Sequence, residues 1–224
     1  MLDIKNVKVY DLKESVIACR NAMRTTMPEY TDEEFEKSLS RAIKLVQASK
    51  NSDVKCHDNF LTGIRVSFDV TYPQYWSPEF QRYNFIDIVT SSSKMHRLKK
   101  MMIRQSTNKY VSPEVIYAAQ KHVDRYNQIL NDESIDTFEY YDTSSSEADT
   151  LISVKGRNEA VYAAFMVMLS NCPLGLELFM RVSTNYKQLQ NIYKQRKNHR
   201  LKEDWGAFCK MIEELPYSKE FIIL

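Results

Sequence analysis

The polar residues whose spacing best suits chemistry lie near the C-terminus, in the segment TNYKQLQNIYKQRKNHRL. Asn185, Lys187, Asn191, Arg196 and Arg200 recur along this segment with few acidic neighbours. Asn185 and Arg196 are three helical turns apart, so a helix would bring them to one face. Asparagine offers a donor and an acceptor to the edge of a heterocycle, and an arginine fork suits a phosphate. The alternative interpretation is a solvated basic helix face.

A second polar segment, FQRYNFIDIVTSSSKMHRLKK, combines aromatic, hydroxyl and basic residues. Ser91, Ser92 and Ser93 precede Lys94, which places three hydroxyls and their backbone N–H groups beside a cation. This arrangement suits an anion, although serine runs are mostly turns. Arg82 lies among aromatic residues, where it would either stack on a planar ligand or cover an apolar patch.

Several classes of chemistry are excluded by residue counts and spacing. The four glycines are far apart, so Gly-rich dinucleotide and phosphate loops are absent. The four cysteines form no CxxC pair and the histidines lack metalloprotease spacing, so we expect no metal and no disulfide scaffold. His57 precedes a predicted strand, and a single histidine in that setting is more often a structural hydrogen-bonding group than a catalyst.

The composition is that of an ordinary globular protein. The chain has 224 residues, 43% of them hydrophobic and 27% charged. A formal net charge of +2 gives no electrostatic reason to expect a dedicated nucleic-acid-binding protein. The sequence has no apolar run long enough for a membrane span, so we expect no membrane partner and a reduced, cytoplasmic location.

The elements that must position the polar residues follow from hydrophobic periodicity. Residues 12–24 and 32–50 have helical spacing, and Thr31 is the expected N-cap of the second helix. Residues 60–72 instead place an apolar side chain at every second position. This alternation predicts a strand with one buried face.

The second half of the chain predicts mostly helices. The predicted elements are a helix from Pro113, capped by Ser112, to about Leu130; an acidic surface loop over 131–149; a helix from Gly156 to near Pro173; a strand over LELFMRVST; and helices over 184–200 and 202–214. In the last helix we expect Trp205, Phe208, Ile212 and Leu215 to face inward. A modest antiparallel or mixed sheet packed against long helices predicts an α+β fold, in a single domain over residues 1–224.

Taken in order, these segments resemble the flavin-dependent thymidylate synthases (ThyX) over nearly the whole chain. The resemblance places His57, Phe68, Pro73 and Arg82 on matching positions of the family's central stretch, Ser92 on its active serine and Lys94 on the following arginine. The helix that carries Asn185 matches the family pattern N-x-R-x-x-x-N-x-x-x-x-R-x-x-x-H, with three of five positions identical. The family signature RHRxxSxNExSxRY is largely replaced, since its histidine, second arginine and glutamate are here Tyr83, Asn84 and Thr90.

The resemblance implies an enzyme that binds FAD over a pyrimidine nucleotide and transfers a folate-derived one-carbon unit to C5 of dUMP. NADPH and methylenetetrahydrofolate would be co-substrates, and the sites would form between subunits of a homotetramer. No protein nucleophile attacks the base, so catalysis is positioning and electrostatics. The implied residues are Ser92 and Arg196 in catalysis, Arg82, Ser92, Ser93, Lys94 and Arg196 at the nucleotide, and His57, Asn59, Arg82, Tyr83, Asn84, Asn185, Lys187, Asn191 and Arg200 at the flavin.

Two other functions fit the same sequence. A related enzyme would keep flavin and pyrimidine nucleotide but change the acceptor or the carbon unit, as the replacements Tyr83 and Thr90 indicate. A protein without flavin chemistry would keep the fold as a nucleotide-binding or assembly module. Retention of Asn185, Asn191 and Arg196 favours a ligand over complete loss of the site.

Overall fold

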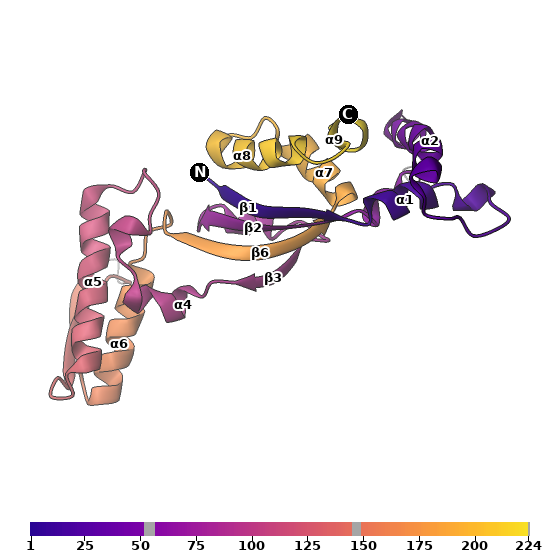
Figure 1. Ribbon diagram of the computed structural model, residues 1–224. Helices are drawn as coiled ribbons and strands as arrows, with labels where there is room; N and C mark the ends of the chain where they lie inside the picture. Colours follow the sequence, from indigo (N-terminus) through magenta and orange to yellow (C-terminus); the bar gives the residue numbers. More distant parts are fainter. Residues whose placement is uncertain (52–56, 145–148, 224) are drawn as a thin grey trace. The chain divides into compact units, whose positions relative to one another are not determined.

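The computed structural model describes residues 1–51, 57–144 and 149–223 (Figure 1). The chain folds as two compact units, each described separately below. The sheet unit comprises Met1–Tyr72, Trp76–Ser91 and Phe179–Leu224. The hairpin unit comprises Pro73–Tyr75 and Ser92–Leu178. A single domain over the whole chain stays a prediction.

A four-stranded sheet forms the centre of the sheet unit (Figure 1). Its strands, in spatial order, are β1 (Asp3–Tyr10), β2 (Arg65–Pro73), β6 (Glu177–Asn185) and β3 (Asp87–Ser91). The β1–β2 and β3–β6 pairs are antiparallel. Strands β2 and β6 confirm the sequence prediction, whereas β1 and β3 were not predicted, because most of their residues are exposed and show no apolar alternation.

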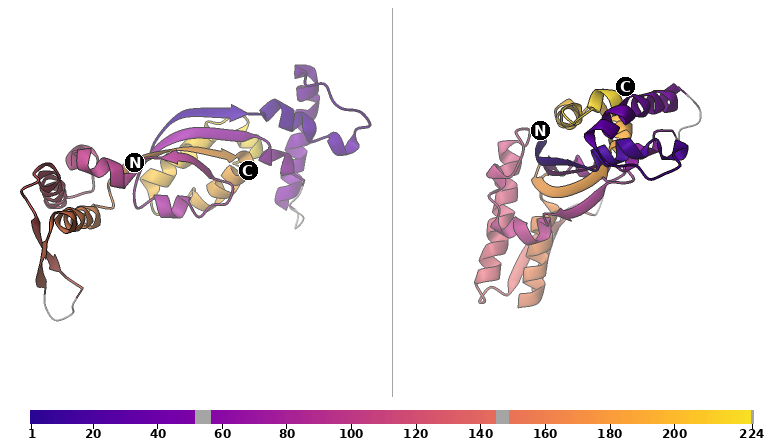
Figure 2. Two further views of the ribbon diagram at one scale, coloured as in Figure 1. Left: turned by 90° about the horizontal axis from the view of Figure 1, so that it is seen from below. Right: turned by 45° about the vertical axis from the view of Figure 1, so that its right-hand side comes forward.

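The core of the sheet unit lies between the sheet and the C-terminal helices. Helices α7 (Tyr186–Arg196), α8 (Lys202–Glu213) and α9 (Ser218–Phe221) lie over one face of the sheet (Figures 1 and 2). Phe68 of β2 and Phe208 of α8 are fully buried, with ring centroids 5.7 Å apart. The predicted inward-facing residues of the last helix, Trp205, Phe208, Ile212 and Leu215, are all buried.

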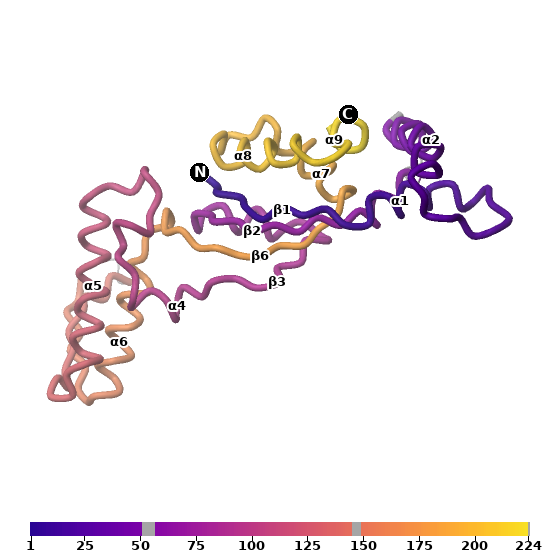
Figure 3. The backbone as a smooth tube through the Cα atoms, viewed as in Figure 1, coloured from indigo at the N-terminus to yellow at the C-terminus, as the bar shows by residue number. Residues whose placement is uncertain are grey.

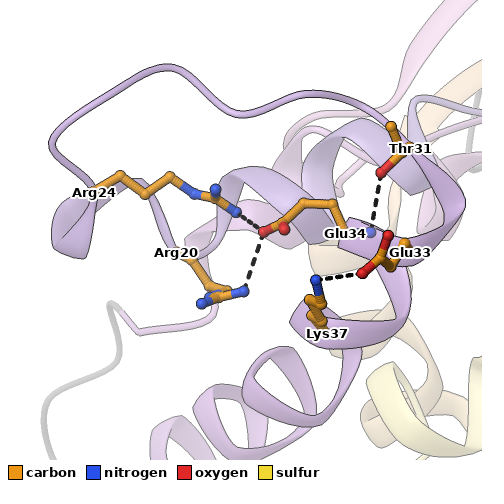
Figure 4. A network of polar contacts seen from close by, with 6 residues as sticks. All are labelled: Arg20, Arg24, Thr31, Glu33, Glu34 and Lys37. Atoms are coloured by element: carbon orange, nitrogen blue, oxygen red, sulfur yellow. Dashed lines mark hydrogen bonds and ion pairs between the residues drawn. The ribbon is translucent and has the colours of Figure 1, made fainter.

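The remaining helices of the sheet unit lie in its N-terminal half. They are α1 (Leu12–Ala18), the 3-10 turns η1 (Asn21–Met23) and η2 (Asn59–Thr62), α2 (Asp32–Asn51) and the short α3 (Ser77–Phe80). The predicted cap of α2 is confirmed, because the Glu34 N–H donates to Thr31 Oγ1 at 3.2 Å (Figure 4). The predicted helix over 12–24 breaks after Ala18, where Arg20 and Arg24 both donate to the Glu34 carboxylate (Figure 4).

The hairpin unit contains a pair of packed helices and a two-stranded antiparallel sheet. Its elements are α4 (Lys94–Arg97), the 3-10 turns η3 (Leu98–Lys100) and η4 (Ile103–Gln105), α5 (Pro113–Asn131), β4 (Thr137–Asp142), β5 (Thr150–Lys155) and α6 (Arg157–Ser170). Helices α5 and α6 pack side by side (Figure 3) and confirm two predicted helices. Ser112 precedes α5 as predicted, but its side chain makes no capping hydrogen bond.

The prediction of a loop throughout 131–149 is wrong for 137–142. These residues form β4, which pairs with β5 from Thr137–Lys155 to Asp142–Thr150. The acidic composition concealed a short alternating run in which Phe138 is buried and its neighbours are exposed. Pairing with the following strand, β5, stabilises this short strand.

None of the helices in the described part of the chain is long and apolar enough to cross a membrane.

Candidate functional site

Helix α7 begins directly at the end of β6 and is held by a side-chain cap. Asn185 has extended backbone, and its Oδ1 accepts the Gln188 N–H at 2.9 Å. Leu189 and Ile192 are fully buried against the core. The cap and these apolar contacts fix which face of α7 is exposed, so its polar residues have defined positions.

A pocket of about 400 Å³ lies along this helix, and we call it the α7 pocket. Its lining residues are Ser49, Lys50, Asp58, Lys187, Gln190, Asn191, Tyr193, Lys194, Lys197 and Ile222. Lys187, Asn191 and Lys194 follow i, i+4, i+7 spacing and therefore share one face of α7. Four lysines and a single aspartate make this pocket cationic.

The aspartate of the α7 pocket is buried, and only one of its two carboxylate oxygens has a partner among the described residues. Asp58 Oδ2 lies 2.5 Å from Lys187 Nζ, and the Asp58 side chain is 2% exposed. Ser49 Oγ accepts the Asp58 backbone N–H at 3.2 Å, and Gln190 Oε1 accepts from Lys187 Nζ at 3.3 Å. Asp58 Oδ1 is buried and has no hydrogen-bond partner among the residues that the structure describes.

The other cations of the pocket are exposed. Lys50, Lys194 and Lys197 have no ion-pair partner within the described ranges. The Tyr193 hydroxyl donates to Glu213 Oε1 at 2.8 Å, and this hydrogen bond raises the pKa of Tyr193 to about 12. The phenol therefore stays neutral at ordinary pH, and the lysines set the positive charge of the pocket. Such a site can bind an anionic ligand.

A second polar cluster, the Arg196 cluster, lies at the C-terminal end of α7 and consists of Glu79, Tyr83, Arg196, His199 and Trp205. Glu79 Oε2 accepts from Arg196 Nη1 and Trp205 Nε1, both at 3.0 Å, and lies 3.5 Å from His199 Nε2. Arg196 Nε donates to Tyr83 Oη at 2.6 Å. The guanidinium carbon lies 4.5 Å from the Trp205 ring centroid. Arg196 Nη2 has no hydrogen bond within the described part of the chain.

The structure brings the predicted site residues together in two groups. Lys187 and Asn191 line the α7 pocket, and Tyr83 contacts Arg196. His57 and Asn59 instead line a separate pocket of about 980 Å³ in the sheet unit. The remaining residues predicted to bind flavin are Asn185, which caps α7, and the exposed Arg82, Asn84 and Arg200.

The serine run divides between the two units. Ser91 ends β3 in the sheet unit, whereas Ser92, Ser93 and Lys94 belong to the hairpin unit. Ser93 Oγ accepts the His96 N–H at 3.4 Å and caps the short helix α4. The ligand roles assigned to these residues stay predictions. No group of three or more potential metal ligands occurs in the described ranges.

Sequence reasoning missed the residues that complete both clusters. Asp58 directly follows His57, but its buried pairing with Lys187 has no sequence signal. Lys194 and Lys197 could have been found from the basic run on the α7 face. Glu79 lies between Pro78 and Phe80 in an aromatic stretch, where nothing marks it as the partner of Arg196.

Comparison with known proteins finds similarity in structure only, since the sequence matches no protein-family model and no curated protein. A structure of the flavin-dependent thymidylate synthase ThyX from Helicobacter pylori, complexed with FAD and dUMP, matches 98% of this chain and 97% of its own, with a TM-score of 0.62 and 12% identity. A second structure, of Helicobacter pylori thymidylate synthase X with FAD and dUMP, matches 100% of this chain and 97% of its own, with a TM-score of 0.60 and 12% identity. The protein therefore has the α+β fold of these enzymes, as predicted.

Proposed function

We propose that the protein is a flavin-dependent thymidylate synthase-like enzyme that transfers a folate-derived one-carbon unit to C5 of dUMP or a related pyrimidine nucleotide. The observation that carries this proposal is the fold similarity over the whole chain to structures that contain FAD and dUMP. The cationic α7 pocket supports it, because the predicted flavin residues Lys187 and Asn191 line that pocket.

The residues of the α7 pocket suit a phosphate-bearing cofactor such as FAD. Lys50, Lys194 and Lys197 supply point charges for phosphate oxygens, and the Asn191 amide offers a donor and an acceptor to a ring edge. Bound flavin would supply the redox chemistry, with NADPH and methylenetetrahydrofolate as co-substrates. The unsatisfied Asp58 Oδ1 is a polar atom that such a ligand can pair.

For the nucleotide, the proposal assigns four residues from the resemblance. Ser92, Ser93 and Lys94 would hold the nucleotide, with Lys94 near the phosphate. Arg196 would orient the pyrimidine edge through the Nη2 group that its internal contacts leave available. We also propose a homotetramer in which different subunits contribute residues to one site. The chain would act by binding and orienting both ligands, without a protein nucleophile.

A nucleotide-binding protein without flavin chemistry is the second candidate, and one observation favours it. Arg196 is 16% exposed, pairs with Glu79 and stacks on Trp205. An arginine with this many internal contacts has a structural reason to be present even without a ligand.

The test is whether the purified protein retains flavin. We expect absorption bands at about 375 and 450 nm to remain after FAD is added and the protein is desalted. We then expect dTMP to form from dUMP when NADPH and methylenetetrahydrofolate are supplied. The double variant Lys194→Gln/Lys197→Gln should retain less flavin, whereas Lys44→Gln, an exposed lysine outside the pocket, should match the wild type. A colourless protein that binds no FAD at tens of micromolar would support the second candidate.

A further inference from the structure

Asp58 is the least satisfied group in the α7 pocket. Its carboxylate is almost fully buried, and Lys187 contacts only Oδ2. The other oxygen, Oδ1, is buried with no donor among the described residues. A buried acceptor without a partner is rare in native proteins, because the group has lost its water without gaining a hydrogen bond.

The ion pair with Lys187 does not by itself explain this arrangement. A single Lys187–Asp58 contact uses one carboxylate oxygen, and the backbone contact with Ser49 positions the residue through its N–H. Both contacts position Asp58, which lines the pocket, and its Oδ1 remains an acceptor that no described residue pairs. An acceptor held in this way selects ligands that carry a donor, because an unpaired buried group penalises every ligand without one.

The surrounding cations restrict the ligand further. Lys50, Lys194 and Lys197 favour an anion, so the ligand must combine a phosphate with an N–H or O–H donor. The side-chain amides of Gln190 and Asn191 add groups that pair with a ring edge. An imide ring carries an N–H between two carbonyls and presents this pattern in both uracil and flavin nucleotides.

We propose that Asp58 is a specificity-determining residue whose Oδ1 accepts the imide N–H of a phosphate-bearing heterocycle in the α7 pocket. The choice between a uracil nucleotide and a flavin nucleotide rests on the proposed function, whereas the contact itself does not. Lys187 is the positioning residue that holds the Asp58 carboxylate through Oδ2.

Matched ligand pairs test this contact directly. Binding of dUMP is compared with binding of its N3-methyl derivative, and binding of FAD with that of N3-methyl-FAD, by calorimetry on the full chain. We expect at least one parent ligand to bind about tenfold more tightly than its methyl derivative, the size of a hydrogen bond to a charged group. The pair that shows the preference identifies which heterocycle the pocket binds.

The variant Asp58→Asn separates the hydrogen bond from steric exclusion of the methyl group. Asparagine keeps the size of the side chain but removes the charge, so the preference for the parent ligand should fall several-fold. Binding of inorganic pyrophosphate, an anion without an N–H, should be unchanged or tighter, because the pocket loses a negative charge. Retained pyrophosphate binding also shows that the variant is folded.

Three results would overturn the assignment. They are equal binding of parent and methyl ligands to the wild type, an unchanged preference in Asp58→Asn, and a pocket that binds pyrophosphate but neither dUMP nor FAD. A protein that keeps the preference but forms no dTMP refutes the proposed reaction and supports the role of Asp58.

Discussion

The α7 pocket and the Arg196 cluster are built on the same helix but treat their cations differently. In the cluster, Arg196 is surrounded by Glu79, Tyr83 and Trp205 and is mostly buried. In the pocket, Lys194 and Lys197 are exposed and make no ion pair with any described residue. A basic helix face therefore contains cations of two kinds: Arg196, whose charge is largely balanced within the fold, and Lys194 and Lys197, whose charge no described residue balances.

The anions of the two regions differ in the same way. Glu79 receives several donors on one oxygen and anchors three side chains. Asp58 receives one side-chain donor, from Lys187, and keeps a buried oxygen unpaired. A carboxylate with surplus donors belongs to the structural framework, whereas one with a missing donor indicates a binding site.

The largest expected effect comes from removing the aromatic centre of the Arg196 cluster. Trp205 is fully buried and contacts Trp76 and Phe208, so Trp205→Ala should lower the free energy of unfolding by about 3–5 kcal/mol. Urea denaturation measures this change. Lys210→Ala, an exposed position in the same helix, should stay within about 0.5 kcal/mol of the wild type. A loss below about 1 kcal/mol would show that the cluster is not structural.

The next largest effect tests whether Arg196 belongs to the framework. Arg196→Ala removes the contact with Trp205 and the ion pair with Glu79, and should destabilise the protein by about 1–2 kcal/mol after allowing for partial exposure. A chain of this size should then melt roughly 2–8 °C lower. Arg200→Ala, at an exposed position just after α7, should leave the melting temperature unchanged. An unchanged melting temperature in Arg196→Ala, together with lost nucleotide binding, would place Arg196 with the ligand-binding cations.

Replacing the pocket lysines should change affinity and leave stability alone. We expect Lys194→Gln/Lys197→Gln to weaken FAD or pyrophosphate binding by about tenfold, because two point charges are lost from a cationic pocket. The loss should shrink as salt is added, since exposed charges are screened. Titration at two salt concentrations measures both effects. Equal affinity in the variant and the wild type would mean that this pocket binds no anion.

The smallest expected effect concerns Glu34, a partly exposed carboxylate that accepts from Arg20 and Arg24. A hydrogen bond from Arg24 lowers the pKa of Glu34 below 4.5, so the ionised form stabilises the folded state (Figure 4). This contribution is present above the unfolded pKa and is lost as the pH falls through the folded pKa. Glu34→Gln should therefore melt below the wild type at pH 7, and the gap should narrow as the pH falls below the ordinary pKa of a glutamate.

A neighbouring residue provides the control for this pH dependence. Glu33 pairs with Lys37 on the exposed surface of the same helix, so Glu33→Gln should change the melting temperature less at pH 7. A gap between Glu34→Gln and the wild type that stays constant down to pH 3 would show that ionisation of Glu34 is not the cause.

The elements that were predicted correctly are those whose apolar pattern is local. The buried alternation of β2, the Thr31 cap of α2 and the inward face of α8 all follow from residues a few positions apart. Strands β1 and β3 were missed because they are stabilised by pairing with strands far away in the sequence, whereas β4 was missed because its acidic residues hid a short alternating run. Local periodicity carries no information about such partners.

The sequence by itself determined the α+β fold class and placed Lys187, Asn191 and Arg196 on one helix. Only the tertiary structure decided which acidic residue pairs with Lys187 and which with Arg196. Asp58 meets Lys187 across 129 positions, and Glu79 meets Arg196 across 117. The physical reason is that the pairing of a charge depends on which distant side chain the packed core brings within hydrogen-bond distance, and residue type and local spacing do not determine this.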